Sequence, residues 1–554
     1  MSSQNKFCAN CTQLFTLTTE DLVMYEQAGI PPTADCMGCT WKRLLGFWIL
    51  GRFRVTKSAL SGKQIITMLP ESVKFPIYEH EEFLSDAWDP LSYGQDYDPN
   101  RPFLEQLTEL QHKVPHPHQL GRLNTACEWT DDWWESKDSY LCRSGYRNET
   151  VSYGYRISTA KECIDCAYCF DIEQSYDCLY CYKGWRLKYC FNTHDSVESA
   201  FLYDCRNCNN CFMSWNLRNK RYCILNQQYT KEEYFEKLKQ YNLRSFSAVQ
   251  KLKEEFWGHL RDEAVHRENL NTQVTACRGN FMTENKNCTN CSFVEKSENC
   301  RQLIRGYEAK DSIEVVSCGL TERSTRTLLD QWSYGNSCVM YVTNCRYSMY
   351  LDSCEECQDC FGSVGLRKKK HCILNKQYTK EEYEKLRERI KQDMVKRGEW
   401  GKFFPFEMAY GPFNMSLARW SFPHMGKKEA EAMGARWEET PIPSYENAIA
   451  SDKLPDLIDD VKDEITKQRL ICVESKLSYN IAPHELAFYR QHGIPLPQKH
   501  FDQRTFERFR PMCLMFMPQH GICYYCKKEI EHYYDPELGF KKISCTPCYQ
   551  QNIS

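Results

Sequence analysis

The chain has 554 residues, and its 71 lysines and arginines against 74 aspartates and glutamates give a formal net charge of −3. So balanced a charge excludes a protein whose whole surface attracts nucleic acid or anionic membranes. Hydrophobic residues make up 42% of the chain and aromatic residues 14%, which excludes general disorder. The longest apolar run, residues 44–50, is too short to span a bilayer, so we expect no membrane partner.

Cysteine is the most informative residue type, because the chain carries 33 of them. The total is odd, most cysteines stand in Cys-x-x-Cys pairs, and no signal-peptide pattern precedes Cys8. This usage predicts a reducing compartment, the cytoplasm, in which thiols bind metal or lie buried. The common nucleotide-binding, zinc-protease and hydrolase motifs are absent and no small-molecule substrate is evident, so we interpret the protein as non-enzymatic.

Four cysteines near the amino terminus have the spacing of a tetrahedral zinc site, because each Cys-x-x-Cys turn supplies two thiolates. These are Cys8, Cys11, Cys36 and Cys39. The second pair leads into a helical pattern, which is typical of a treble clef. A second set, with a β-prone segment between its pairs, is typical of a zinc ribbon and consists of Cys523, Cys526, Cys545 and Cys548. We therefore predict about two zinc ions per chain.

One pattern recurs at both ends of the chain, 464 residues apart from Cys8 to Cys472. Each end is predicted as a clef unit followed by a ribbon unit. In the carboxy-terminal clef only two ligands remain, Cys472 and His500. The same offset places Ala59 and Gly62 opposite the first two ribbon cysteines. We predict that both of these copies are free of metal.

A second duplication, at an offset of 149 residues, forms two cysteine-rich blocks in the middle of the chain. From Cys127 to Cys223 the cysteines are spaced by multiples of three, and the second block follows the same rule from Cys288 to Cys372 with Cys338 as its exception. Such phasing is typical of a short β-solenoid with buried thiols. Zinc clusters and an iron–sulfur cluster are the alternatives. Their ligands would be Cys205, Cys208, Cys211 and Cys223 in the first block, and Cys354, Cys357, Cys360 and Cys372 in the second.

Each block ends in a Thr-x-x-Glu capping box, at Thr230 and at Thr379, which predicts helices over 231–242 and 380–395. A further helix is predicted over 248–267, and an irregular arm over 398–447. The fold class is thus multidomain, mixed and β-rich, with duplicated zinc modules flanking two repeat blocks that are each followed by helices. The predicted segments are 1–58 (treble clef), 59–125 (degenerate ribbon with an aromatic and acidic segment), 126–229 (first block), 230–272 (helical insert), 273–378 (second block), 379–458 (helix and arm), 459–522 (degenerate clef) and 523–554 (zinc ribbon).

Basic residues recur at one place in both blocks and are candidate nucleic-acid ligands. They are Arg218, Lys220 and Arg221 in the first block, and Arg367, Lys368, Lys369 and Lys370 in the second. The functional hypothesis is a zinc-stabilised scaffold that binds RNA, the ribosome, another nucleic acid or a protein partner. An iron–sulfur redox protein and a thiol-rich metal store or sensor are the alternative functions.

Several phrases, among them FTLTTEDLVMYEQAGIPP, LRKKKHCILNKQYTKEEYEKL and GEWGKFFPF, resemble a family of uncharacterised zinc-ribbon, cysteine-repeat proteins of bacteria with reduced genomes. The resemblance covers nearly the whole chain. It implies zinc-binding ends around cysteine-rich repeats and supplies no activity. The helix after Cys39 is more apolar here than the arginine-rich version expected of that family, which weakens any nucleic-acid inference drawn from the family.

Overall fold

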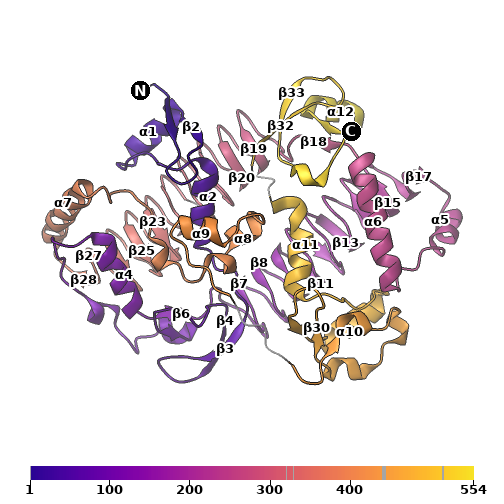
Figure 1. Cartoon of the computed structure of the whole chain (residues 1–554), viewed down its shortest axis with the longest axis horizontal. Helices are drawn as coiled ribbons and strands as arrows, with labels where there is room; N and C mark the ends of the chain where they lie inside the picture. Colours follow the sequence, from indigo (N-terminus) through magenta and orange to yellow (C-terminus); the bar gives the residue numbers. More distant parts are fainter. Residues whose placement is uncertain (1, 320, 329, 440–444, 514–516, 554) are drawn as a thin grey trace. The chain divides into compact units, whose positions relative to one another are not determined.

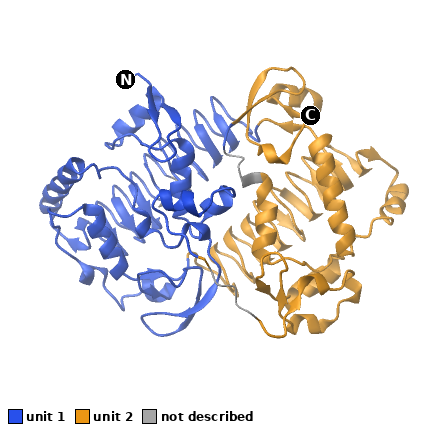
Figure 2. Ribbon diagram, in the orientation of Figure 1, with its two compact units in different colours: residues 1–119, 269–438, 513–518 blue, residues 120–268, 439–512, 519–554 orange. Residues whose placement is uncertain are grey.

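A computed structural model describes residues 2–319, 321–328, 330–439, 445–513 and 517–553 (Figure 1). The fold is mixed α/β, and the chain divides into two compact units (Figure 2). Unit 1 contains residues 1–119, 269–438 and 513–518, and unit 2 contains 120–268, 439–512 and 519–554. Each unit therefore combines one repeat block with the terminal segment that lies farther from it in the sequence. The segments predicted from the sequence follow chain order and do not indicate which terminal segment packs with which repeat block.

The first repeat block forms a ladder of parallel strands in unit 2. The strand pairs join residues twelve apart, such as Arg143 with Tyr155 and Trp185 with Val197. Isolated bridges, such as Thr125 with Lys137, keep the same step. The ladder consists of β7 (Asp131–Trp134), β8 (Arg143–Tyr146), β9 (Glu149–Ser152), β10 (Tyr155–Ser158), β11 (Lys161–Ile164), β12 (Phe170–Glu173), β13 (Tyr182–Lys188), β14 (Val197–Tyr203), β15 (Asn209–Trp215) and β16 (Arg221–Ile224), and it ends with the antiparallel β17 (Gln227–Gln228).

Within each turn of this ladder the backbone follows a three-residue cycle. Every third residue from Ala126 to Leu225 has a positive φ, near 50°. The next residue of each triplet is an inward position, as at Cys163, Cys166 and Cys169, which are all fully buried. Four triplets make one turn of twelve residues. The cysteine phasing follows from this cycle, although phasing by three cannot by itself give the length of a turn.

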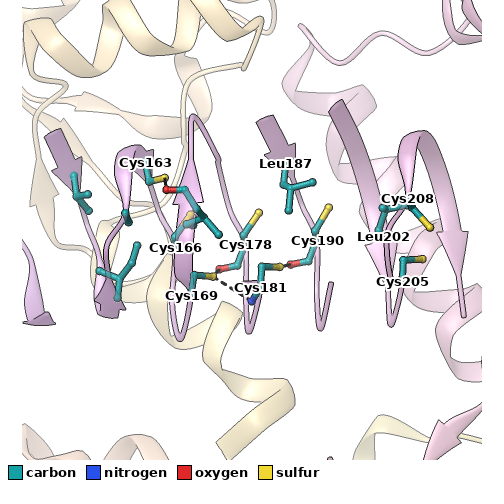
Figure 3. Packing of buried hydrophobic residues seen from close by; sticks show 14 of the residues in the cluster. Cys163, Cys166, Cys169, Cys178, Cys181, Leu187, Cys190, Leu202, Cys205 and Cys208 are labelled. Carbon is teal, nitrogen blue, oxygen red and sulfur yellow. Dashed lines mark hydrogen bonds between the residues drawn. The ribbon is translucent and has the colours of Figure 1, made fainter. Parts of the chain in front are cut away.

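The interior of the first block is filled by side chains of complementary size. Figure 3 shows cysteine, leucine and other apolar side chains from successive turns lying in a row between the strands. Where Trp133 occupies the interior, the next turn provides Gly145, and a Cβ atom there would lie only 2.0 Å from the indole ring. Small thiols suit such a narrow core because interiors are packed to crystal-like density.

The second block forms a similar ladder in unit 1, with the same step of twelve residues between Ser337 and Met349. Cys338 lies at a positive-φ position instead of an inward one, and its Sγ lies 3.6 Å from the carbonyl oxygen of Lys402. The arm therefore covers this thiol, which explains the break in phasing. The strands are β19 (Arg278–Thr283), β20 (Thr289–Glu295), β21 (Cys318–Gly319), β22 (Asp330–Gln331), β23 (Ser337–Met340), β24 (Val342–Thr343), β25 (Met349–Asp352), β26 (Phe361–Val364), β27 (Cys372–Ile373) and β28 (Lys376–Gln377).

Both predicted capping boxes are present, at Thr230 with Glu233 and at Thr379 with Glu382. They open α5 (Lys231–Leu238) and α7 (Lys380–Lys396). Helix α6 (Phe246–Asp262) ends five residues before the predicted 267, because His266 and Arg267 form β18 and pair with β34 (Ile543–Ser544). The arm carries the short helices α8 (Leu417–Ser421) and α9 (Lys427–Ala432), and its residues 440–444 lie outside the described ones.

The terminal segments contain four antiparallel hairpins and several helices. The hairpins are β1 (Gln4–Phe7) with β2 (Leu14–Leu17), β3 (Arg54–Lys57) with β4 (Gln64–Thr67), β30 (Leu470–Ile471) with β31 (Ser478–Tyr479), and β32 (Gln519–Ile522) with β33 (Glu529–His532). The helices are α1 (Thr19–Gln27), α2 (Met37–Gly46), α3 (His80–Leu84), α4 (Phe103–Lys113), α10 (Pro483–His492), α11 (Phe501–Cys513) and α12 (Thr546–Ile553). Short parallel pairs join β5 (Ile77–Tyr78) to β6 (His116–Pro117) and β29 (Ile449–Ala450) to β30. In the part of the chain described here, every helix is too short or too polar to cross a membrane.

Candidate metal centres

The amino-terminal cysteine set lies where a hairpin turn meets the start of a helix. Cys8 and Cys11 lie in the turn between β1 and β2, and Cys36 and Cys39 lie at the start of α2. The four sulfurs lie within 4.8 Å of one another, and those of Cys11 and Cys36 are 3.6 Å apart. Hydrogen bonding to the Cys39 side chain lowers the pKa of Cys36 to about 5. The set can therefore supply a thiolate at neutral pH.

The carboxy-terminal set has the same arrangement. Cys523 and Cys526 lie in the turn between β32 and β33, and Cys545 and Cys548 lie at the start of α12. The Cys545 sulfur lies 3.6 Å from that of Cys523 and 3.8 Å from that of Cys526. Burial raises the pKa of Cys523, but hydrogen bonds from backbone N–H groups, first that of Cys545, lower it to about 6.

Both sets fit a tetrahedral metal ion. Zinc holds thiolate sulfurs at about 2.3 Å, which places two of them about 3.8 Å apart in a regular tetrahedron. The sulfur separations of 3.6 to 3.8 Å in both sets match this geometry. The structure thus confirms that the predicted cysteines gather into two sets that could hold a metal ion.

The second pair of the carboxy-terminal set differs from a ribbon, in which it would lie in another hairpin. Here Cys545 directly precedes α12, and Cys548 lies within its first turn. Pro547 accounts for the difference, because proline cannot donate a ladder hydrogen bond but fits the first turn of a helix.

All four terminal hairpins share one knuckle turn. A residue with positive φ stands four positions after the first knuckle residue in every copy, at Thr12 (60°), Gly62 (76°), Lys476 (60°) and Lys527 (61°). In each copy this residue donates its backbone N–H to the carbonyl of the first knuckle residue, over 2.9 to 3.1 Å. In each copy a helix also begins directly after the third ligand position: α2 after Cys36, α3 after Glu79, α11 after His500 and α12 after Cys545. Among the described residues, four terminal segments therefore share one hairpin-and-helix arrangement.

The second copy corrects the predicted register by one residue. Ser58, not Ala59, occupies the place of Cys523, because it donates its N–H to Lys63 O as Cys523 does to Lys528 O. The four ligand positions of this copy are accordingly Ser58, Ser61, Glu79 and Glu82. The ungapped offset missed them, although the Glu79-x-x-Glu82 spacing reproduces that of a knuckle pair.

In the second copy, hydrogen bonds connect the positions at which the first and fourth copies have sulfurs. Glu79 donates its backbone N–H to Ser58 Oγ at 3.3 Å, just as Cys36 donates to Cys8 Sγ at 3.2 Å. Ser58 Oγ also donates to the Glu82 carboxylate. Hydrogen bonds from the Ser58 and Ser61 hydroxyls hold the pKa of Glu82 below its usual value.

The third copy retains Cys472 and His500 at two ligand positions, as the sequence indicates. Ser475 donates its backbone N–H to Cys472 Sγ at 3.5 Å, and His500 Nδ1 accepts the backbone N–H of Asp502 at 3.1 Å. This ring nitrogen therefore accepts a hydrogen bond from the first turn of α11.

The repeat cysteines lie along the interiors of the ladders instead of at the corners of a tetrahedron. Cys163 Sγ, for example, lies 3.2 Å from the carbonyl oxygen two residues before it and 3.6 Å from that of Ile172 in the next turn. Serines take the same place, as Ser175 Oγ does with Glu173 O at 2.9 Å. Among the described residues, no three repeat cysteines hold their sulfurs within 4.8 Å of one another. This placement applies to the eight candidate ligands Cys205, Cys208, Cys211, Cys223, Cys354, Cys357, Cys360 and Cys372.

The repeat thiols differ from one another in their pKa values. Burial raises the pKa of Cys142, an isolated thiol, to about 12. Where thiols adjoin, burial raises the pKa of Cys169, whereas hydrogen bonds to Cys169 and Cys178 outweigh burial at Cys181 and lower its pKa to about 5. Adjoining thiols therefore share protons unequally.

The two basic loops divide into engaged arginines and exposed lysines. Arg218 lies 3.3 Å from Asp204 and donates to the hydroxyl of Tyr549 on α12 at 2.5 Å. The Arg367 guanidinium lies over the ring of Trp88 at 5.3 Å. The side chains that remain toward solvent are Lys220, Arg221, Lys368, Lys370 and, in part, Lys369.

No family model matches the chain, and a search of curated proteins returned no match either.

Proposed function

We propose that the protein is a non-enzymatic, zinc-stabilised interaction scaffold. In this proposal the amino-terminal set is a treble clef and its carboxy-terminal counterpart binds zinc in the same way. Between them, two β-solenoids supply extended surfaces for a partner. The zinc ions are structural, because all four ligands in each set come from the chain and leave no open position for chemistry.

The repeated knuckle geometry is the observation that carries this proposal. Cysteine occupies all four ligand positions in two of the four modules, and there the sulfurs approach to 3.6–3.8 Å. Each module is small and has little core of its own, so metal binding would contribute directly to its folding. The solenoid interpretation rests on the twelve-residue pairing step and the inward thiols.

Metal analysis of the native protein tests the proposal. We expect about two zinc ions per chain and an X-ray absorption spectrum with four sulfur neighbours at about 2.3 Å. A content of four or more zinc ions would favour the predicted clusters in the repeats, and stoichiometric iron would favour the redox alternative.

For the partner we propose RNA, in line with the predicted basic loops. The exposed side chains of Lys220, Arg221, Lys368 and Lys370 support this proposal, whereas Arg218 and Arg367 are engaged within the fold. Alanine at these four exposed positions should weaken binding and reduce the salt slope by about 0.7–0.9 for each lost phosphate contact. Alanine at Lys385 and Arg389, which are exposed on α7, is the matched control. An unchanged salt slope would remove the loops from the binding site.

A further inference from the structure

A groove of about 670 Å³ lies on one side of the second repeat block in unit 1. Its lining combines aromatic and charged side chains, chiefly Lys310, Glu322, Trp332, Tyr334, Arg346 and Tyr347. Trp332 and Tyr347 are each 54% exposed, which is unusual for side chains of this size.

The twelve-residue step explains the form of this groove. Lys310, Glu322, Tyr334 and Arg346 pair in succession across neighbouring turns, so they form a straight floor along the ladder. Trp332 and Tyr347 occupy the positive-φ positions on either side of that floor and form its two rims. Successive turns are about 4.8 Å apart, so the groove extends along the stacking direction over several turns.

The Tyr347 rim is held in place. The rings of Tyr334 and Tyr347 meet edge to face, with centroids 5.4 Å apart. Gly335, at a φ of +66°, lies under the Tyr347 ring, where a Cβ atom would come within 3.0 Å of it. A defined aromatic surface therefore faces the groove, and none of the described residues covers it.

The charges of the groove indicate an uncharged ligand. Lys310 lies 3.9 Å from Glu322, and farther along the same row Lys286 lies 2.9 Å from Glu298. Acids and bases thus alternate along this row. The lining as a whole carries three cations, Lys296, Lys310 and Arg346, and two carboxylates, Glu308 and Glu322, so its charges nearly balance. A phosphate backbone would meet these carboxylates, whereas sugar hydroxyls can donate to carboxylates and accept from lysine and arginine.

We propose that this groove binds an uncharged glycan chain that runs along the ladder. The ring faces of Trp332 and Tyr347 would stack on the apolar faces of sugar rings. Tyrosine and tryptophan suit this role because each combines a large apolar ring with a polar group that can remain hydrated. The floor residues would hydrogen-bond the hydroxyls. This proposal does not depend on the zinc sites or on RNA binding.

Titration calorimetry of the full chain with neutral hexasaccharides (cello-, xylo-, manno-, chito- and laminarihexaose) tests the proposal, with polyuridylate as the charged comparison. We expect at least one hexasaccharide to bind, and Trp332→Ala or Tyr347→Ala to weaken it by about tenfold each. Tyr146→Ala, an exposed tyrosine of the first block, is the matched control and should leave affinity unchanged. The proposal is overturned if none of the hexasaccharides binds, if the rim variants bind as well as wild type, or if these variants lose polyuridylate and no glycan.

Discussion

The Ser58 hydroxyl donates a hydrogen bond to the Glu82 carboxylate at positions that correspond to Cys8 and Cys39 of the first module. Hydrogen bonds thus cross-link the second module where sulfurs converge in the first and fourth. The backbone of the turn is nevertheless the same, including the positive φ of 76° at Gly62. The knuckle backbone therefore persists where no thiol occupies a ligand position.

Restoring the four ligands should restore a metal site. Because the backbone is already arranged, the variant Ser58→Cys/Ser61→Cys/Glu79→Cys/Glu82→Cys should bind one additional zinc ion, which mass spectrometry under native conditions would detect. The control places cysteine at Ala59 and Gly62, the register that the ungapped alignment suggests, together with the same two glutamate substitutions. We expect no additional zinc in the control, and equal zinc content in both variants would contradict the corrected register.

The intact and degenerate modules should respond differently to loss of a thiol. Cys526→Ser should release one zinc ion and unfold the carboxy-terminal module, because structural zinc in small domains contributes roughly 10–16 kcal/mol to folding. Cys472→Ser is the matched control, since its module retains only two of the four ligands. Zinc content by elemental analysis should fall by one ion in the first variant and stay constant in the second. A loss from the Cys472 variant would reveal a metal in the third module.

Repeat thiols should tolerate serine. Cys205 Sγ lies 3.4 Å from the Tyr203 carbonyl and 3.7 Å from that of Ser214, a geometry that serine reproduces elsewhere in the ladder. Cys205→Ser should therefore leave zinc content unchanged and alter the unfolding free energy by about 1 kcal/mol. Cys205→Leu should cost more, about 2 kcal/mol, because it overfills a closed interior. Loss of metal from the serine variant would support a cluster in the repeat.

The sequence allowed some of this organisation to be predicted and not the rest. Ligand spacing identified both four-cysteine sets, and Thr230 and Thr379 located two helix starts, because both depend on residues close together in the chain. The pairing of each terminal segment with the distant repeat block depends on tertiary packing and has no local signal. The one-residue shift at Ser58 also escaped detection, because no cysteine remains in this module and only the Glu79-x-x-Glu82 spacing reproduces that of a knuckle pair.

Arg218 is expected to act in folding more than in ligand binding. It pairs with the buried Asp204, which also lies 3.3 Å from Arg206. Arg218→Ala should lower the unfolding free energy by about 2 kcal/mol, because it leaves a buried carboxylate with fewer partners. Lys220→Ala, at an exposed neighbouring position, should change it by no more than about 0.5 kcal/mol. Urea denaturation of both variants provides the comparison, and equal stability would show that the ion pair contributes nothing.

Stability of unit 2 should fall as the pH rises toward neutrality, because of Glu485. This side chain is fully buried and accepts hydrogen bonds from Tyr153 at 2.8 Å and Tyr489 at 3.0 Å. Burial raises its pKa to about 7, from an ordinary value of 4.5. Between these two pH values the folded chain binds a proton that the unfolded chain has released, so the unfolding free energy declines as pH increases.

The decline attributable to Glu485 should reach about 3 kcal/mol between pH 4.5 and pH 7.5. Glu485→Gln removes the titrating group and keeps one oxygen, which can accept from one of the two tyrosines. The stability of the variant relative to wild type should therefore increase as the pH rises. Glu464→Gln, at an exposed position, should follow the wild-type pH dependence. Urea denaturation at half-unit pH intervals measures the three curves. If the Glu485→Gln curve runs parallel to that of wild type, the carboxyl group is ionised in the folded protein throughout this range, stabilised by the nearby Arg504 guanidinium.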